Sequence, residues 1–81
     1  MYKITLGVDG MMCGMCEAHV NDKIRNNFKI KKVNSSHTNN KTIVIAKEEI
    51  SKDALKKAIE ETGYKLTSYY IEPYKKKGLF G

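Results

Sequence analysis

The hydrophobic period of the chain changes at Gly10, and this change constrains the fold more than any other feature. Before it, Ile4, Leu6 and Val8 alternate with polar or small residues, which predicts a half-buried strand over residues 2–9. After it, apolar side chains recur at every fourth position, which is typical of an amphipathic helix over residues 14–27. The apolar positions of this stripe are Cys16, Val20, Ile24 and Phe28.

Two further strands are predicted after this helix. Residues 31–37 indicate a weak strand, in which Ser35 and His37 stand where inward-facing apolar residues are expected. We therefore expect this edge of the sheet to be less well packed. Residues 42–46, TIVIA, are mostly β-branched and predict a strand strongly. Between the two strands, the asparagines at 39–40 indicate a turn, because Asn tolerates left-handed backbone angles.

A second helix and a last strand complete the chain. Ser51 is the predicted N-cap of the helix, and Gly63 is its predicted stop residue. The stripe between them consists of Leu55, Ala58, Ile59 and Thr62. Residues 65–72 predict the last strand, which Pro73 ends. The order of elements predicts an α+β fold, a ferredoxin-like βαββαβ sandwich whose four-stranded antiparallel sheet carries two helices on one face.

The length of 81 residues corresponds to a single domain. We expect this domain to span residues 1–72 and a flexible basic tail, with a lysine run at 75–77, to span residues 73–81. The chain has no apolar run near the ~20 residues that a transmembrane helix needs. Its N-terminus also lacks the apolar stretch of a signal peptide. We therefore expect a cytoplasmic location, where thiols are kept reduced.

The two cysteines of the chain lie at the junction between the first strand and the first helix. Segment 10–16 has the sequence GMMCGMC, which contains Cys13 and Cys16. Thiolates are soft ligands that select Cu(I), Zn(II) and similar ions. The unsatisfied N–H groups and the partial positive charge at a helix start favour the thiolate form. The segment therefore indicates a soft-metal site or a redox dithiol.

Right-handed crossovers determine which loops share one end of such a fold. They place the cysteine segment, the turn at 39–40 and the loop at 63–64 together, so Tyr64 is an expected neighbour of the sulfurs. His37 belongs to an edge strand, separated from the first strand by the third. At about 4.8 Å per strand, this histidine is too far away for easy ligation. We expect His37 to be a surface or half-buried residue and His19 to be solvated.

The cysteine segment resembles the GMxCxxC signature of heavy-metal-associated domains. This family comprises small metallochaperones and the cytosolic N-terminal domains of metal-transporting P-type ATPases. The resemblance extends over residues 3–71. Val20 and Ile24 fall on core positions of the family's first helix, and residues 61–64, ETGY, match the end of its second helix. Ile30 and Val33 match its GVxxV segment, although a lysine precedes Ile30 where the family has glycine.

The resemblance implies that Cys13 and Cys16 bind Cu(I) and pass it to a partner by exchange of thiolate ligands. It implies that Met11 packs under the loop and that Tyr64 lies close to the metal, as in bacterial copper chaperones. The implied partner is the metal-binding domain of a copper-transporting P-type ATPase. The net charge of +6 suits a partner that is acidic. We expect a carrier rather than an enzyme, present as a monomer or as a copper-bridged dimer.

For the other methionines of the segment, Met12 and Met15, we expect exposed positions. A zinc or mercury carrier of the same fold is an alternative to a copper carrier. Zinc prefers four ligands, with His or carboxylate supplementing sulfur. The related zinc domains favour a carboxylate next to the first cysteine, where this chain has Met12. Mercury carriers share the motif but usually have an export signal. Whether the chain is an independent chaperone or a piece of a transporter stays open.

Other classes of function are weakly supported by the sequence. A thioredoxin-like dithiol has a Trp before its first cysteine and a Pro between the two, and both are missing here. RNA-recognition motifs share the element order, but they stack bases on aromatic residues of the central strands. Residues 42–46 contain no aromatic residue, so we expect no nucleic-acid binding. No nucleophile, base and orienting group stand at workable spacings for catalysis.

Overall fold

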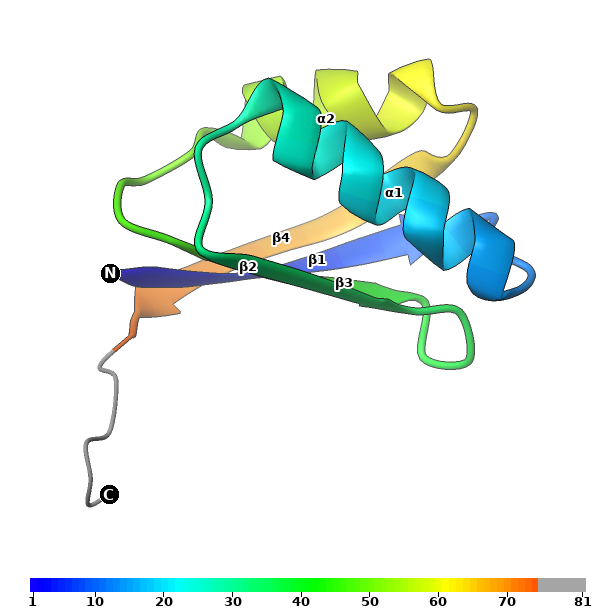
Figure 1. The fold of residues 1–81 in the computed structure, drawn as a ribbon, viewed down its shortest axis with the longest axis horizontal. Helices are drawn as coiled ribbons and strands as arrows, with labels where there is room; N and C mark the ends of the chain where they lie inside the picture. Colours follow the sequence, from blue (N-terminus) through cyan, green and yellow to red (C-terminus); the bar gives the residue numbers. More distant parts are fainter. Residues whose placement is uncertain (75–81) are drawn as a thin grey trace.

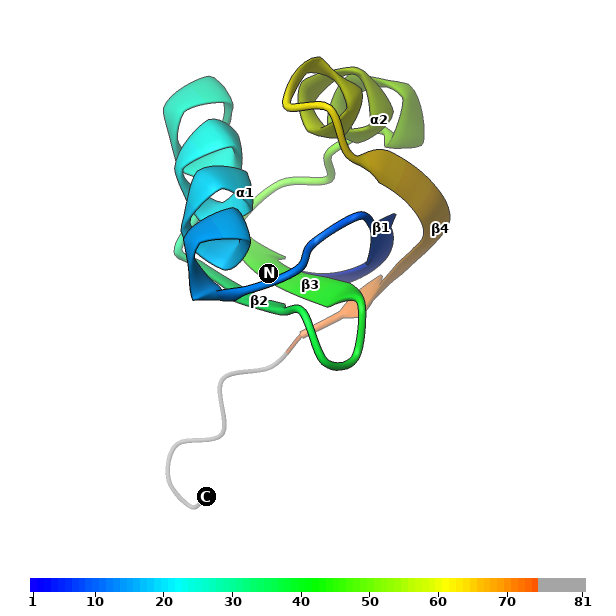
Figure 2. The same ribbon diagram turned by 90° about the vertical axis from the view of Figure 1, so that its right-hand side faces the viewer.

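The computed structural model describes residues 1–74, which form six elements in the predicted order. The elements are β1 (Tyr2–Asp9), α1 (Gly14–Asn27), β2 (Lys32–Ser36), β3 (Lys41–Ala46), α2 (Lys52–Glu61) and β4 (Lys65–Pro73). The strands form one sheet in the order β2-β3-β1-β4, and every neighbouring pair is antiparallel. Both helices lie on the same face of this sheet (Figure 2). The predicted ferredoxin-like sandwich is confirmed.

The core lies between the sheet and the two helices. The alternation in β1 turns Ile4, Leu6 and Val8 towards the helices, where all three are fully buried. These side chains pack in the core with other fully buried residues, which include Val20, Ile24, Val44, Leu55 and Ile59. Because β1 is a central strand, its end is held on both sides, by β3 and by β4. The loop that leaves β1 therefore starts from a fixed point.

The helix ends follow from local chemistry. The Ser51 hydroxyl accepts a hydrogen bond from the Ala54 N–H at 3.2 Å, so the predicted N-cap of α2 is confirmed. Gly63 adopts a φ of 94°, a left-handed angle that ends the helix. The two helices are also linked by an ion pair between Lys23 and Glu61 at 2.7 Å. Within residues 1–74, neither helix is long and apolar enough to cross a membrane.

Three connections meet at one end of the sheet, as predicted: the β1–α1 loop, the β2–β3 turn and the α2–β4 loop (Figure 1). Asn40 has a φ of 53°, and its carbonyl accepts a hydrogen bond from the Val8 N–H at 2.9 Å. Gly10 has a φ of 108° and lies against Tyr64, so a Cβ on this glycine would be 3.1 Å from Cδ1 of the tyrosine. The glycine therefore allows the first loop to pass close to the third.

The opposite end of the sheet holds the N-terminus and the end of β4 (Figure 1). Pro73 is still part of β4, opposite Tyr2, although we predicted that the strand ends at residue 72. A proline without an N–H is tolerated at the end of an edge strand. The Tyr74 N–H then donates to the Met1 carbonyl at 2.8 Å, which extends the pairing. The rest of the predicted basic tail, including the lysines at 75–77, lies outside the described residues.

The β2 edge is closed by polar side chains where we expected loose packing. Ser35 is buried, with 8% of its surface exposed. Its hydroxyl donates to Asn21 Oδ1 of α1 at 2.6 Å and lies 2.8 Å from the hydroxyl of Thr42, which is fully buried. A hydroxyl can do both, because it is donor and acceptor at once. Hydrogen bonds thus take the place of an apolar contact between β2, β3 and α1.

This network predicts an asymmetric mutational response. Ser35→Ala should destabilise the fold by about 1–3 kcal/mol, because it leaves the buried Thr42 hydroxyl without its partner. The double variant Ser35→Ala/Thr42→Val should be less destabilised than the sum of its single changes, because no buried hydroxyl then lacks a partner. Urea unfolding of the unaltered chain, the two single variants and the double variant measures the coupling free energy between Ser35 and Thr42. Strictly additive free energies of unfolding would contradict the role of this hydrogen bond.

Candidate metal centre

The cysteine loop is anchored on the side that faces the core and is exposed on its outer side. After Gly10, Met11 turns into the core and keeps only 5% of its surface exposed, as predicted. The flanking Met12 and Met15 are 79% and 71% exposed, which is also as predicted. The buried methionine side chain therefore fixes the base of the loop, because a well-packed core tolerates little movement. The segment between Met12 and Met15 is left on the surface.

Cys13 and Cys16 stand on the first turn of α1. Cys13 is the N-cap residue, and its carbonyl accepts hydrogen bonds from the N–H groups of Cys16 at 3.0 Å and Glu17 at 3.2 Å. The turn brings the two Sγ atoms to 4.0 Å from each other. This separation is far longer than the disulfide length of about 2.05 Å, and both residues are thiols. Cys13 is exposed, whereas Cys16 is half-buried against the core.

Tyr64 reaches this turn from the α2–β4 loop at the same end of the sheet. It is half-buried and packs on the core beside the cysteine loop, as predicted. The nearby Tyr64 hydroxyl has the largest of the effects that lower the pKa of Cys16 to about 7. Backbone groups of Met12 and Cys13 contribute to the same shift. In return, the thiolate raises the pKa of the Tyr64 hydroxyl, which must keep its proton to donate. The tyrosine is therefore the largest single contributor to the lowered pKa.

Glu17 is a residue of this end that the sequence did not reveal. One oxygen of its carboxylate, Oε2, accepts hydrogen bonds from the His37 backbone N–H and from His37 Nδ1, each at 2.7 Å. These bonds lower the pKa of Glu17, the backbone bond most strongly. They tie the turn that carries Cys16 to the segment that follows β2. The acidic residue in the first helical turn was the available signal, but its partner emerges only in the fold.

The donor set at this end consists of sulfur. Within residues 1–74, no group of three or more His, Cys, Asp or Glu side chains is arranged to hold a metal ion. His19 is exposed on α1, and His37 is bound to Glu17. A soft ion at the usual metal–thiolate distance of about 2.3 Å would have room between the two sulfurs. Two soft donors with an open outward side suit an ion of low coordination number.

Comparison with known proteins agrees with this geometry. Residues 5–65 match the heavy-metal-associated domain. No curated protein sequence matches the chain. The chain belongs to the heavy-metal-associated domain family, and metal binding is the class of function that this membership defines.

Solved structures include several similar domains. The chain is similar to the CopZ metallochaperone, with a TM-score of 0.73 and 26% identity over 80% of this chain and 98% of the other. It is similar to a copper-binding domain from the P-type ATPase HMA7, with a TM-score of 0.73 and 25% identity over 85% and 97%. The N-terminal domain of ZntA in its Zn(II) form has a TM-score of 0.73 and 24% identity over 82% and 89%, a likeness of fold alone.

The contact between Tyr64 and Cys16 predicts the pH dependence of thiol reactivity. Alkylation of Cys16 by iodoacetamide should rise with pH through a midpoint near 7, because the thiolate is the reacting species. Tyr64→Phe removes the donor and should move this midpoint upwards. Fragment-ion mass spectrometry of the peptide that carries both cysteines distinguishes alkylation of Cys16 from that of Cys13. Tyr70→Phe, at a 61% exposed position, is the matched control and should leave the midpoint in place. An unchanged midpoint in Tyr64→Phe would contradict the assignment.

Proposed function

We propose that this chain carries a soft metal ion, Cu(I), between the thiolates of Cys13 and Cys16, and transfers it to a partner by ligand exchange. The observation that carries the proposal is the pair of sulfurs 4.0 Å apart on an outward-facing helical turn. A buried pair would hold an ion but could not release it to another protein. A carrier needs an open side, from which an incoming thiolate reaches the ion before an old ligand leaves.

The donor set favours Cu(I) over zinc. Cu(I) is a soft ion that thiolates select, and two or three sulfurs can satisfy it. Structural zinc sites have four protein ligands, and His or carboxylate often supplements sulfur. Near Cys13 and Cys16, the described residues offer no third donor of this kind. The similarity to a metallochaperone and to a copper-binding ATPase domain supports the same choice.

Two further residues support the ligands in this proposal. Met11 does not bind the metal but fixes the base of the loop by its burial in the core. The Tyr64 hydroxyl makes the largest contribution to lowering the pKa of the Cys16 thiol to about 7. A lower pKa aids metal uptake at neutral pH, because the ion displaces fewer protons. Both residues therefore act on the metal through the cysteines.

The proposed partner is an acidic metal-binding domain of a copper-transporting P-type ATPase. Lys41 and Lys65 begin β3 and β4 at the cysteine end, and both are exposed. Together with the net charge of +6, they favour approach of an acidic surface to the cysteines. The proposal also requires a compartment that keeps both cysteines as thiols, as the cytoplasm does.

Competitive titration under reducing conditions tests the metal assignment. The chain should bind Cu(I) in preference to Zn(II), one ion per molecule, against a chromogenic chelator. Cys13→Ser and Cys16→Ser should each weaken Cu(I) binding by more than the roughly 10–100-fold that loss of an outer partner costs. Met15→Leu is the control, because this exposed residue lies between the cysteines but is not a proposed ligand. We expect it to leave Cu(I) affinity almost unchanged. Tighter binding of zinc than of copper would reject the copper assignment.

Transfer to the acidic domain should depend on ionic strength. Raising the salt concentration should slow Cu(I) transfer, because surface charges are screened beyond about 8–10 Å at 0.1–0.15 M salt. The double variant Lys41→Gln/Lys65→Gln should show a slower transfer at low salt and a weaker salt dependence. Stopped-flow mixing of the loaded chain with the apo domain measures both rates. A rate that salt leaves unchanged would reject electrostatic docking.

A further inference from the structure

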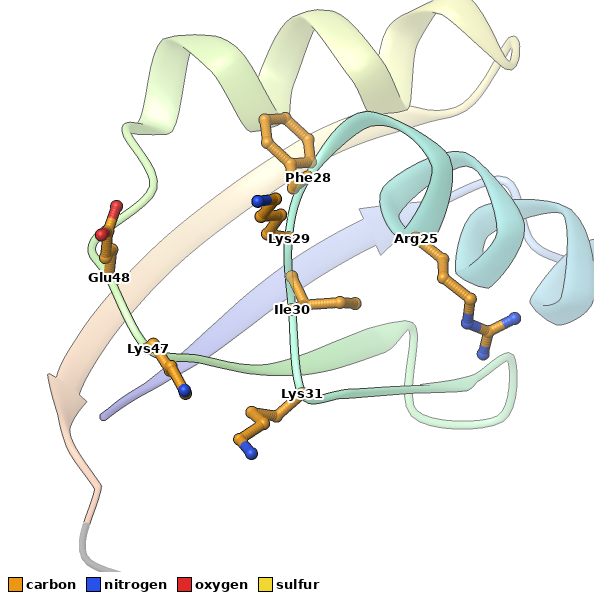
Figure 3. A pocket seen from close by; sticks show the side chains of 7 residues that line it. All are labelled: Arg25, Phe28, Lys29, Ile30, Lys31, Lys47 and Glu48. Atoms are coloured by element: carbon orange, nitrogen blue, oxygen red, sulfur yellow. The ribbon is translucent and has the colours of Figure 1, made fainter.

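A basic hollow lies at the end of the domain that faces away from the cysteines. It has a volume of about 570 Å³ and lies between the α1–β2 connection and the β3–α2 connection (Figure 3). Its cationic residues are Arg25, Lys29, Lys31 and Lys47, and Glu48 is its only acidic lining residue. α1 spans 14 residues, so its two ends are about 20 Å apart. A molecule in this hollow would leave Cys13 and Cys16 uncovered.

Two of the residues that line the hollow are apolar. Phe28 and Ile30 line it and are half-buried, because both also pack on the hydrophobic core. The backbone here is held in place, since the Phe28 N–H donates to the Ile24 carbonyl at 3.0 Å and the Lys31 N–H donates to the Ile45 carbonyl at 2.7 Å. The hollow therefore offers apolar and cationic side chains on a backbone that is held in place.

Most of the cationic side chains that line this hollow form no ion pair with the residues that the structure describes. Arg25 is paired with Asp22 at 3.1 Å and stands in the last turn of α1, where a cation also favours the helix end. Within residues 1–74, Lys29, Lys31 and Lys47 form no ion pair. These three exposed lysines lie on the two connections, outside the helix, so helix stability does not explain them.

A second hollow of about 220 Å³ adjoins the first. The two share Lys31, and the second is also lined by Lys32, Ile45, Met1 and Tyr74. Met1 and Tyr74 are 41% and 37% exposed, so apolar surface continues past the shared lysine. Two neighbouring hollows with a cation between them fit an extended chain, whose side chains occupy successive sites, better than one compact ligand.

We propose that this end of the domain binds an acidic peptide segment that carries an apolar side chain. Lys29, Lys31 and Lys47 would pair with its carboxylates, and the apolar side chain would rest on Phe28 and Ile30. A lipid headgroup layer is a poorer match, because Phe28 and Ile30 are half-buried against the core and cannot enter a bilayer. The inference goes beyond the proposed metal transfer, since it involves neither cysteine.

Nuclear magnetic resonance on the full, metal-free chain tests the inference. The probe is a short peptide in which Asp and Glu residues flank one Phe. We expect its largest shifts at residues 28–31 and 47–48. The triple variant Lys29→Gln/Lys31→Gln/Lys47→Gln should weaken binding about tenfold, in line with the modest value of each exposed charge pair. A peptide with Ala in place of Phe should also bind less tightly.

A variant with the same charge tests the specificity of this effect. Lys52, Lys56 and Lys57 are exposed on α2, and their replacement by Gln removes as much charge as the first triple variant. This control should bind the peptide as the unaltered chain does. An equal loss in both variants, or shifts centred on the cysteine loop or on residues 75–77, would overturn the proposal. Tighter binding to vesicles of anionic phospholipid than to the peptide would overturn it in favour of a membrane site.

Because the chain is free of metal in these measurements, their result does not depend on which ion it carries. Failure of the peptide to bind would leave the copper proposal untouched. Conversely, a chain that prefers zinc would still be expected to bind the acidic peptide at residues 28–31 and 47–48.

Discussion

The contact of Tyr64 with the cysteine loop is the interaction on which the site depends. It joins the start of α1 to the segment before β4, which is far away in the sequence. Gly10 permits the close approach, because a side chain there would press on the tyrosine ring. The Tyr64 hydroxyl then lowers the pKa of Cys16 to about 7, so one residue influences both the shape of the loop and the charge of its sulfur. The βαββαβ topology makes this contact possible by placing both loops at one end of the sheet.

The loop combines a fixed base with an exposed top, and this combination suits a carrier. Met11 is buried in the core, whereas Met12, Cys13 and Met15 lie on the surface. Glu17 adds a second restraint by holding the first turn of α1 to His37. Restraint from the core side keeps the sulfurs 4.0 Å apart while Cys13 stays exposed. The fold thus supplies rigidity on one side of the two cysteines and access on the other, which the proposed ligand exchange requires.

Much of the fold and part of the site could be predicted from the sequence. The spacing of Cys16, Val20 and Ile24 predicted the first helix, and the alternation before Gly10 predicted the first strand. The order of the elements predicted the four-stranded antiparallel sheet. The position of Tyr64 beside the cysteines followed from the handedness of the crossovers alone. The bonds of Ser35 and of Glu17 could not be predicted, because polar residues at inward or loop positions leave no periodic pattern. They depend on side-chain directions that exist only after the strands and helices have packed. The basic hollow lined by Arg25 and by residues 28–31 and 47–48 could not be predicted for a similar reason, because it forms between two connections that share no sequence pattern.

The two ends of the domain have different chemistry, sulfur at one and a lysine-rimmed apolar hollow at the other, and α1 separates them. The central claim concerns the sulfur end: Cu(I) is held by the thiolates of Cys13 and Cys16. X-ray absorption at the copper edge of the Cu(I)-loaded chain tests it most directly. The account predicts two sulfur neighbours in the metal-loaded monomer and none of nitrogen or oxygen. A copper ion coordinated by nitrogen or oxygen, or one whose sulfur shell persists after both cysteines are replaced by serine, would contradict it.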